Sequence, residues 1–349
     1  MSLHGQFIHP TSPLWGEVLT RTRHDFYHLP EYSLLAAAEG ETPSAFHARA
    51  GEHMMLVPFM RKSLPPDISG AQPLTDAISP YGYPGPIWSK GAPAEFIHDS
   101  LVFMADEMRK HQILSGFFRL HTLLNHPEQF AGVGELVLHG PTVYIDLTLS
   151  EDELLRQTRR GHRREIVALR QAGFVATIDH DWSRLDDFMV CYHQTMDRVN
   201  ASAFYYFPKS YFLRLRKMLG DSASLCIVEL DGQVACAGIT TVMDGIAQYH
   251  LSATATAYLP AHPSKLMLHF LSLQLKQQGA SVFHIGGGVG SLEDKLHLFK
   301  SGFSPLAAEF WTWRIISDQG LYDDAVARWS EIKGQTPVDP AAFFPQYRA

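Results

Sequence analysis

The sequence predicts an α/β (mixed α+β) fold in which mostly antiparallel sheets are flanked by helices. Short apolar runs bounded by turn residues alternate with longer segments whose apolar residues recur at helical spacing. Three strands at 225–230, 234–242 and 246–254 follow one another directly, as in a meander. The chain has 349 residues, 46% of them hydrophobic, which is enough for two domains with ample cores.

The composition limits the partners of the chain. A net charge of -7 gives no global attraction to nucleic acid, so any such contact must use a local basic patch, and no DNA partner is expected. The 19 histidines include no pair with metal-ligand spacing, so no metal is expected. The start of the chain does not resemble a signal peptide, and nowhere do 18 apolar residues run together. A cytoplasmic protein without an integral membrane segment is the expectation.

The N-terminal half begins with helical pieces at 15–38 that are broken at Pro30. Two strands joined by a tight turn follow, and then a helix and a further strand, expected at 46–49, 53–60, 93–111 and 116–121. Between them, Ser79–Trp88 holds three prolines, two glycines and two tyrosines in ten residues. Such a stiff segment cannot be a central strand, because proline donates no backbone hydrogen bond. It is either a rigid connector or a loop that faces a ligand.

The middle of the chain predicts a domain boundary. Residues 125–140 are rich in turn formers and lead into a strand at 142–147, which divides the chain into domains 1–145 and 146–349. Ser150 and Glu153 form a capping box for one helix that runs to about Gln171.

That helix carries the densest basic run of the chain. Its buried side is expected to be marked by Leu155, Ile166 and Leu169, and its six arginines stand at 156, 159, 160, 163, 164 and 170. Guanidinium groups at this spacing can grip successive phosphates. A solvated helix face explains the run equally well.

The C-terminal half continues with a helix at 183–199 and an aromatic loop at 204–208. In the meander, a two-residue turn at 231–232 would pair Cys226 with Ala237 and point the thiols of Cys226 and Cys236 to opposite faces. Reduced, structural cysteines are therefore expected. An apolar helix at 264–278 follows, and the strand at 281–285 is expected beside the strand at 246–254.

A glycine-rich turn follows that last strand, in Ser281-Val-Phe-His-Ile-Gly-Gly-Gly-Val-Gly-Ser291. A helix is expected to begin at Ser291, with Asp294 completing a capping box and Gly302 ending the helix. A Rossmann fingerprint is excluded because the third glycine is missing, and a P-loop because no Gly-Lys-Ser/Thr opens the helix. The turn either binds a ligand or is only a sharp connection.

The segment His284-Ile-Gly-Gly-Gly288 followed by Phe299-Lys300-Ser-Gly-Phe303 resembles the Fem family of aminoacyltransferases, within the GNAT superfamily. Three other segments look similar to that family: Pro80–Pro86, the arginines at 159–164, and Tyr249–Ser252. The resemblance covers most of residues 20–315. It implies tandem GNAT-like domains, each with a mixed sheet flanked by helices.

The resemblance also implies a site. Lys300 with Phe299 would hold the donor end or stabilise developing negative charge, which makes Lys300 the candidate catalytic residue. The expected substrate-binding residues are Phe299, Tyr83, Tyr205, Tyr206, Tyr249, His284, Gly287 and Gly288. Phosphate or tRNA contacts are expected from Arg160, Arg163, Arg164 and Lys265.

Two departures bear on the mechanism and the donor. Ser89 stands where the family's peptidoglycan enzymes have an aspartate proposed as general base, and a serine at its ordinary pKa cannot replace it. CoA-dependent GNAT enzymes hold pyrophosphate on a glycine-rich loop, but here Tyr258-Leu-Pro-Ala-His-Pro-Ser-Lys265 has no glycine and two prolines.

Three functions remain open. The preferred one is transfer of an aminoacyl group from aminoacyl-tRNA, as co-substrate without a bound cofactor, to an amine. The acceptor would be a small molecule or a cell-wall or polysaccharide precursor with a free amine. The alternatives are an N-acyltransferase that uses acetyl-CoA or another acyl-CoA on a sugar or small amine, and a catalytically silent GNAT-like binding protein.

Overall fold

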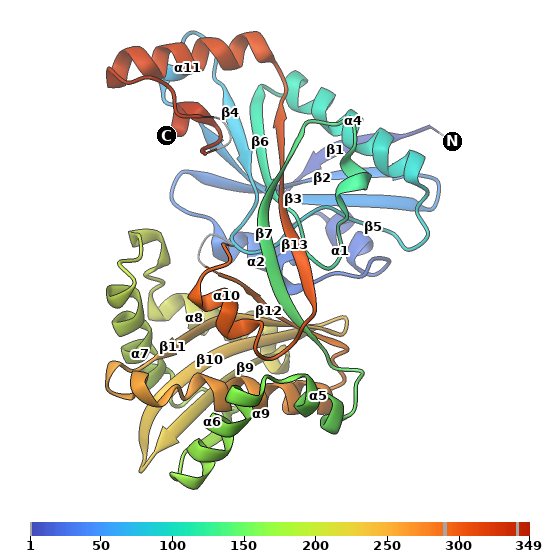
Figure 1. The fold of residues 1–349 in the computed structure, drawn as a ribbon. Helices are drawn as coiled ribbons and strands as arrows, with labels where there is room; N and C mark the ends of the chain where they lie inside the picture. Colours follow the sequence, from blue (N-terminus) through green and yellow to red (C-terminus); the bar gives the residue numbers. More distant parts are fainter. Residues whose placement is uncertain (1, 289–291, 340–341) are drawn as a thin grey trace. The chain divides into compact units, whose positions relative to one another are not determined.

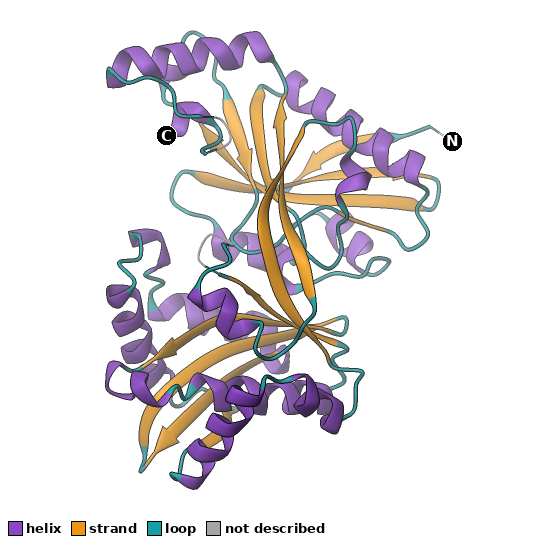
Figure 2. Cartoon of the chain, viewed as in Figure 1, coloured by secondary structure: helices purple, strands orange, loops and turns teal. Residues whose placement is uncertain are grey.

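The computed structural model describes residues 2–288, 292–339 and 342–349, and the chain forms two compact units. Unit 1 comprises residues 1–139 and 309–349, and unit 2 comprises residues 140–308 (Figure 1). The expected domains, 1–145 and 146–349, differ from these units chiefly in residues 309–349, which pack with the N-terminal residues. Each unit combines a sheet with helices (Figure 2), so the expected mixed α/β class is confirmed.

The sheet of unit 1 has the strand order β1-β2-β3-β4-β6-β13. All of these neighbours are antiparallel except β4 and β6, which run parallel. A short strand, β5, pairs with β3 off this path. The bounds are β1 His4–Ile8, β2 Glu41–Ala50, β3 His53–Ser63, β4 Thr75–Ile78, β5 Ile87–Trp88, β6 Ile113–Arg119 and β13 Ala307–Ile316.

Helices cover both faces of this sheet. The apolar stripe of α4 (Ala94–Lys110) packs on one face, with Leu101, Met104 and Met108 fully buried. The other face carries α1 (Pro13–Leu19) and α11 (Gln319–Lys333). The shorter helices are η1 Phe26–His28, α2 Pro30–Ala36, α3 Pro66–Ser69, η2 Pro127–Phe130 and η7 Gln346–Arg348.

The last residues of the chain are held inside unit 1. The hydroxyl groups of Tyr347 and Ser115 lie 2.6 Å apart, and the Tyr347 ring is buried. Arg348 donates from Nε and Nη2 to the two carboxylate oxygens of Asp76, at 2.8 and 3.3 Å. Burial raises the pKa of Asp76, and the Arg348 guanidinium opposes that shift. Unit 1 therefore depends on both ends of the chain.

The sheet of unit 2 has the order β7-β12-β11-β10-β9-β8, with β11 and β12 as its one parallel pair within the described residues. β7 begins in unit 1 and ends in unit 2. The bounds are β7 Glu135–Asp146, β8 Val175–Asp179, β9 Ala223–Leu230, β10 Gln233–Met243, β11 Ile246–Thr254 and β12 Val282–Gly287.

The helices of unit 2 also divide between two faces. α6 (Arg160–Gln171) and α9 (Ser264–Gln277) share one apolar core with the sheet. α7 (Leu185–Arg198) and α8 (Lys209–Leu219) pack on the opposite face, where Tyr211 meets His250. The remaining helices are α5 Glu151–Gln157, η3 Ala203–Tyr205, η4 Gly220–Ser222, η5 Thr256–Ala261 and α10 Lys295–Lys300.

The prediction of opposite-facing cysteines is wrong. A bulge between Val234 and Cys236 shifts the register, so that Cys226 lies opposite Gly238 and Cys236 opposite Val228. Both thiols then face the same core. The two residues are diagonal neighbours on adjacent strands, and both are free, buried cysteines. Burial raises the pKa of both thiols, which keeps them protonated.

The single long helix predicted at 150–171 is also wrong. The chain leaves the helical conformation at Thr158, whose hydroxyl donates to the carbonyl of Leu154, and α6 starts at Arg160. Because of this break, Leu154 is the buried residue of α5 and Leu155 is exposed, contrary to the prediction. Ile166 and Leu169 are buried as expected.

Two further boundaries differ from the prediction. Residues 135–140, expected as linker, belong to strand β7. Ser291 lies outside the described residues, and the helix after the glycine turn begins at Lys295, because the side chain of Asp294 caps it by accepting from the N–H of His297 at 2.9 Å. Leu292 therefore precedes the helix and does not share its apolar face.

Candidate functional site

The parallel strands β11 and β12 of unit 2 pair at their beginnings and then separate, in the shape of a fork. β11 and β12 pair only at Ile246–Val282, Ala247–Phe283 and Gln248–His284, although β11 continues to Thr254 and β12 to Gly287. β12 instead pairs with β7 on its other side, where a shift of register falls between His284 and Gly286. Strands that separate in this way leave backbone groups between them for a ligand. We call the residues from 248 to 254 and from 284 to 287 the fork.

Lys300 lies at the end of the fork. Its Nζ donates to the carbonyl of Gly287 at 2.7 Å, which joins the last turn of α10 to the end of β12. Burial lowers the pKa of Lys300 to about 8, and the nearby Asp294 carboxylate partly opposes that shift. A lysine of this kind is a compact charge whose protonation changes near neutral pH. Its assignment as the catalytic residue stays a prediction.

The glycine turn is shaped by its own packing. A β-carbon at Gly288 would lie 2.1 Å from the carbonyl oxygen of Leu292 and 2.3 Å from Oδ1 of Asp294. Gly286 has a φ of 75°, a conformation that side chains rarely adopt. Gly286 and Gly288 thus have structural reasons to be glycine. The predicted substrate contact of Gly287 and Gly288 stays a prediction.

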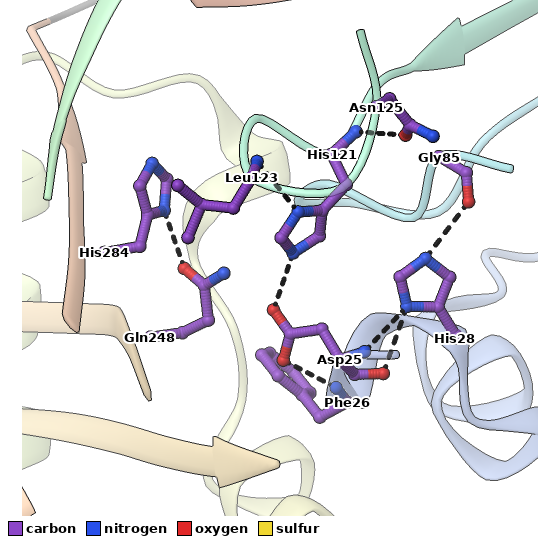
Figure 3. Close-up of polar contacts among 9 residues, drawn as sticks. All are labelled: Asp25, Phe26, His28, Gly85, His121, Leu123, Asn125, Gln248 and His284. Atoms are coloured by element: carbon purple, nitrogen blue, oxygen red, sulfur yellow. Dashed lines mark hydrogen bonds and ion pairs between the residues drawn. The ribbon is translucent and has the colours of Figure 1, made fainter. Parts of the chain in front are cut away.

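His284 occupies the point where the fork opens. Its ring is buried, and Nδ1 lies 2.8 Å from Oε1 of Gln248 on the neighbouring strand (Figure 3). Because an amide oxygen only accepts, this contact places the hydrogen of the imidazole on Nδ1. Tyr249, the next residue of β11, points to the opposite face and packs on the core of α6 and α9, and burial raises its pKa.

A histidine that sequence reasoning missed joins α6 to α10. Nε2 of His162 donates to the carbonyl of Phe299 at 2.9 Å, and its ring lies edge-on to Phe303. Burial lowers the pKa of His162, which favours the neutral ring. Gly302 allows this approach, because a β-carbon there would lie 2.3 Å from Nε2 of His162. The backbone N–H of Arg159 also donates to the carbonyl of Gly302, at 2.7 Å.

The arginines of α5 and α6 are available for a ligand. In the part of the chain that the structure describes, none of the six side chains, at 156, 159, 160, 163, 164 and 170, makes a hydrogen bond or an ion pair. Arg160 and Arg164 are exposed and Arg163 is half-buried. Lys265 differs from them, because its Nζ forms an ion pair with Glu165 of α6.

The aromatic candidates lie in different places. Tyr205 and Tyr206 are partly exposed before α8, and the Tyr206 hydroxyl donates to Asp197 at 2.8 Å. Tyr83 belongs to unit 1, where its ring contacts Tyr27 and Phe310. Their roles toward a substrate stay predictions. The hydroxyl of Ser89 accepts the backbone N–H of Met54 at 3.0 Å, so it ties two strands together.

Unit 1 contains a buried polar network that the sequence did not reveal. Asp25, His28 and His121 are fully buried, and Oδ2 of Asp25 lies 3.1 Å from Nε2 of His121 (Figure 3). His28 accepts the N–H of Asp25 at Nδ1 and donates from Nε2 to the carbonyl of Gly85, both at 3.0 Å. Asn125 donates to the carbonyl of Pro86 at 2.8 Å.

This network fixes the proline-rich loop. A β-carbon at Gly85 would lie 2.0 Å from Oδ1 of Asn125. Burial and the neighbouring His121 lower the pKa of His28 to about 3, so His28 is neutral at physiological pH. One sequence signal could have indicated part of this network. Asp25 and His28 have the spacing of an N-cap and the third residue of the turn that follows it.

The family comparison identifies the class of the C-terminal unit. Residues 156–303 match the model of the acetyltransferase (GNAT) domain. The matched residues contain the fork, α6 and Lys300. The match shows that the chain is an acyltransferase. No curated protein matches the sequence.

Solved structures extend the likeness over the whole chain. FemX has 13% sequence identity and a TM-score of 0.67, covering 92% of this chain and 99% of its own. The C-terminal domain of a putative lysylphosphatidylglycerol synthetase from Agrobacterium fabrum has 12% identity and a TM-score of 0.55, with 90% and 93% covered. A tandem GNAT protein from the clavulanic acid biosynthesis pathway has 11% identity and a TM-score of 0.50, with 90% and 98% covered. The expected Fem-like, tandem GNAT architecture is confirmed.

The described residues contain no helix that is both long and apolar enough to cross a bilayer. Nor do they bring three potential metal-ligating side chains together.

Proposed function

We propose that this acyltransferase moves an aminoacyl group from aminoacyl-tRNA to an amine acceptor. The observation that carries the proposal is the set of six arginines on α5, on α6 and at the N-cap of α6, whose side chains have no protein partner within the described residues. His162 and Glu165 fix α6 to α10 and α9, so the basic surface is rigidly attached to the fork. Guanidinium groups carried by a helix that is held in place suit the successive phosphates of an RNA strand.

The donor loop supports an RNA donor over a CoA donor. Pro260 and Pro263 remove two N–H groups from the segment between β11 and α9, where a pyrophosphate would need them. Lys265, the remaining cation there, is neutralised by Glu165. A carboxylate at that position repels a second anion.

In the proposed reaction, the nitrogen of a neutral amine attacks the ester carbonyl of the aminoacyl group. An amide bond forms, and the bond between the carbonyl carbon and the ribose oxygen breaks. The ammonium of Lys300 stabilises the negative charge that develops on oxygen, and the proton lost by the amine ends on the ribose hydroxyl. The fork orients the ester. The cytoplasmic location expected from the sequence is part of this proposal, since aminoacyl-tRNA is made there.

The second candidate is an acyl-CoA-dependent N-acyltransferase, which would act on a sugar or small amine. The match to an acetyltransferase domain and the net charge of -7 favour it. The two candidates differ in donor binding, which can be measured without knowing the acceptor.

Binding of aminoacyl-tRNA should weaken as salt rises, with a log-log slope on the order of 0.7 to 0.9 per phosphate neutralised. Replacing Arg163 and Arg164 together by Ala should reduce that slope by about 1 to 2 units. Fluorescence anisotropy with labelled aminoacyl-tRNA at several salt concentrations gives the slope, and circular dichroism checks the fold.

The matched control replaces Arg109 and Lys110 by Ala, which removes the same charge from exposed positions at the end of α4. This control should leave the slope unchanged. An unchanged slope in the Arg163/Arg164 variant would contradict the role of α6. Saturable calorimetric binding of acetyl-CoA at micromolar concentration would favour the second candidate.

A further inference from the structure

Unit 2 contains a cavity that is separate from the fork. Its volume is ≈ 780 Å³, and it lies where β8 and β10 end and β9 begins, beside the last turn of α8. In the strand order, β11 and β10 stand between β12 and the β9 edge of this cavity. We call it the α8 cavity. Its size falls in the range of small-molecule sites, which is roughly 300–1,000 Å³.

The lining of the α8 cavity is basic and polar over an apolar base. Arg216 and Lys217 lie beside His180 and the hydroxyl-bearing residues Ser222 and Ser224, and among the described residues Asp221 is the one carboxylate in the lining. Ile178 and Val242 supply apolar surface. The combination of two cations with an apolar wall fits an organic anion.

Arg216 and Lys217 stand in the last turn of α8. Cations in the last turn of a helix complement its dipole, often by donating to its terminal carbonyls. Neither side chain donates to a carbonyl or pairs with a carboxylate within the described residues. Their charges are therefore available to a ligand in the cavity.

We propose that the α8 cavity binds a phosphate ester of nucleotide size, with the phosphate on Arg216 and Lys217 and the sugar and base against Ile178 and Val242. Arginine and lysine both bind phosphate through charge-assisted hydrogen bonds. The same chemistry is present in a free nucleotide and in a nucleotide unit of RNA. The test distinguishes these two sources.

The test uses calorimetry with AMP as the probe and adenosine as the uncharged comparison. The full-length protein should bind AMP saturably, and adenosine should bind at least about tenfold more weakly because it lacks the charged group. Replacing Arg216 and Lys217 by Gln should weaken AMP binding by at least about tenfold. The matched control replaces Lys209 and Arg214 of the same helix by Gln, since neither residue lines the cavity.

A second variant keeps the test decisive if the Arg216/Lys217 variant does not fold. Gln278 is exposed at the rim, so Gln278→Trp should fill the entrance without changing charge and should also abolish AMP binding. Lys300→Met should bind AMP as the wild type does, because Lys300 belongs to the fork. Absent AMP binding, equal binding of adenosine, or full binding by Gln278→Trp would each overturn the proposal. Tighter binding of oligoadenylate RNA than of AMP would identify RNA as the source, and the reverse order a free nucleotide.

Discussion

Five strands of each unit follow one another in the same order, β1-β2-β3-β4-β6 in unit 1 and β8-β9-β10-β11-β12 in unit 2, but the parallel pairs that they contain differ. In unit 2, β11 and β12 separate after Gln248 and His284. In unit 1, β4 and β6 pair along all of β4, from Thr75 to Ile78. Ser79 extends this pairing, because its N–H donates to the carbonyl of Phe117 and its hydroxyl accepts the N–H of Arg119.

The region after each parallel pair differs as well. Unit 2 continues into a glycine turn whose end is held by Lys300. Unit 1 has a proline-rich loop that His28 and Asn125 hold through backbone carbonyls. A repeated fold therefore need not repeat a site. In the function that we propose, the opening of the strands, more than the strand order, places acyl transfer in unit 2.

The largest expected effect is on Lys300. Replacing it by Met keeps most of the side-chain volume and removes the charge, and should lower kcat by about 10²–10³-fold, as the loss of one oxyanion-stabilising donor does. Initial rates of aminoacyl transfer measure this effect. Lys110→Met in unit 1, at an exposed position, is the control and should retain wild-type rates. If kcat fell by a comparable factor in both variants, Lys300 would have no special role, and the proposed difference between the two units would be contradicted.

The protonation of Lys300 predicts a pH profile. Its pKa of about 8 means that the ammonium is lost as pH rises through 8, so the rate should fall on the alkaline side. Lys300→Arg, which stays charged, should lose this alkaline limb. A rate that rises through pH 8 would instead assign Lys300 as a base.

The next effect concerns acid stability, where the units should behave alike. His28 in unit 1 and His250 in unit 2 are both buried, and burial lowers the pKa of each to about 3. Unfolded histidine binds a proton below about pH 6.5, but the folded protein does not until about pH 3. Each histidine should therefore lower the free energy of unfolding as pH falls through this window, by at most about 1.4 kcal/mol per pH unit.

Urea unfolding at pH 7 and pH 4.5 tests this expectation. Five of the six tryptophans belong to unit 1 and only Trp182 to unit 2, so fluorescence reports chiefly on unit 1. His28→Asn should reduce the pH dependence of the fluorescence transition. A transition that does not depend on pH in the wild type would contradict the neutral state of His28.

The smallest expected effects are on stability, and they compare two glycines of unit 2, one packed against a neighbour and one in open space. Gly302→Ala places a β-carbon against His162 and should cost about 1–3 kcal/mol while weakening the attachment of α6. Gly161→Ala, on α6 itself, meets nothing within 4 Å and should stabilise the helix by about 0.5–1 kcal/mol. Thermal unfolding of the two variants measures both. Equal stability changes would show that the contact between His162 and Phe299 is not essential.

Periodic patterns predicted most of the fold, because apolar stripes and alternations follow directly from local geometry. The hairpins of β2 with β3 and of β9 with β10 and the apolar face of α4 are examples. The errors arise where tertiary contacts override the local pattern. The helix ends at Gln157 in part because the N–H of Arg159 donates to Gly302, more than 140 residues away in the sequence. One bulged residue at Ala235 reverses the expected facing of the cysteines.

The candidate site likewise has a part that local sequence predicts and a part that depends on tertiary contacts. Lys300 and the glycine turn are local in sequence and could be predicted together from the motif. His162 was missed because nothing near it in the sequence indicates its partner Phe299. The carboxylate that neutralises Lys265 was missed for the same reason, since Glu165 lies on another helix.

The position of Arg348 has a consequence for how the protein is made. Unit 2 is one continuous stretch of chain, but unit 1 needs β13, α11 and the final residues that contact Asp76 and Ser115. Because synthesis proceeds from the N-terminus, unit 2 is complete on the ribosome before unit 1 can be. Until Arg348 has been synthesised, Asp76 lacks its guanidinium partner. Residues 1–139 can complete unit 1 only after residues 309–349 have been made.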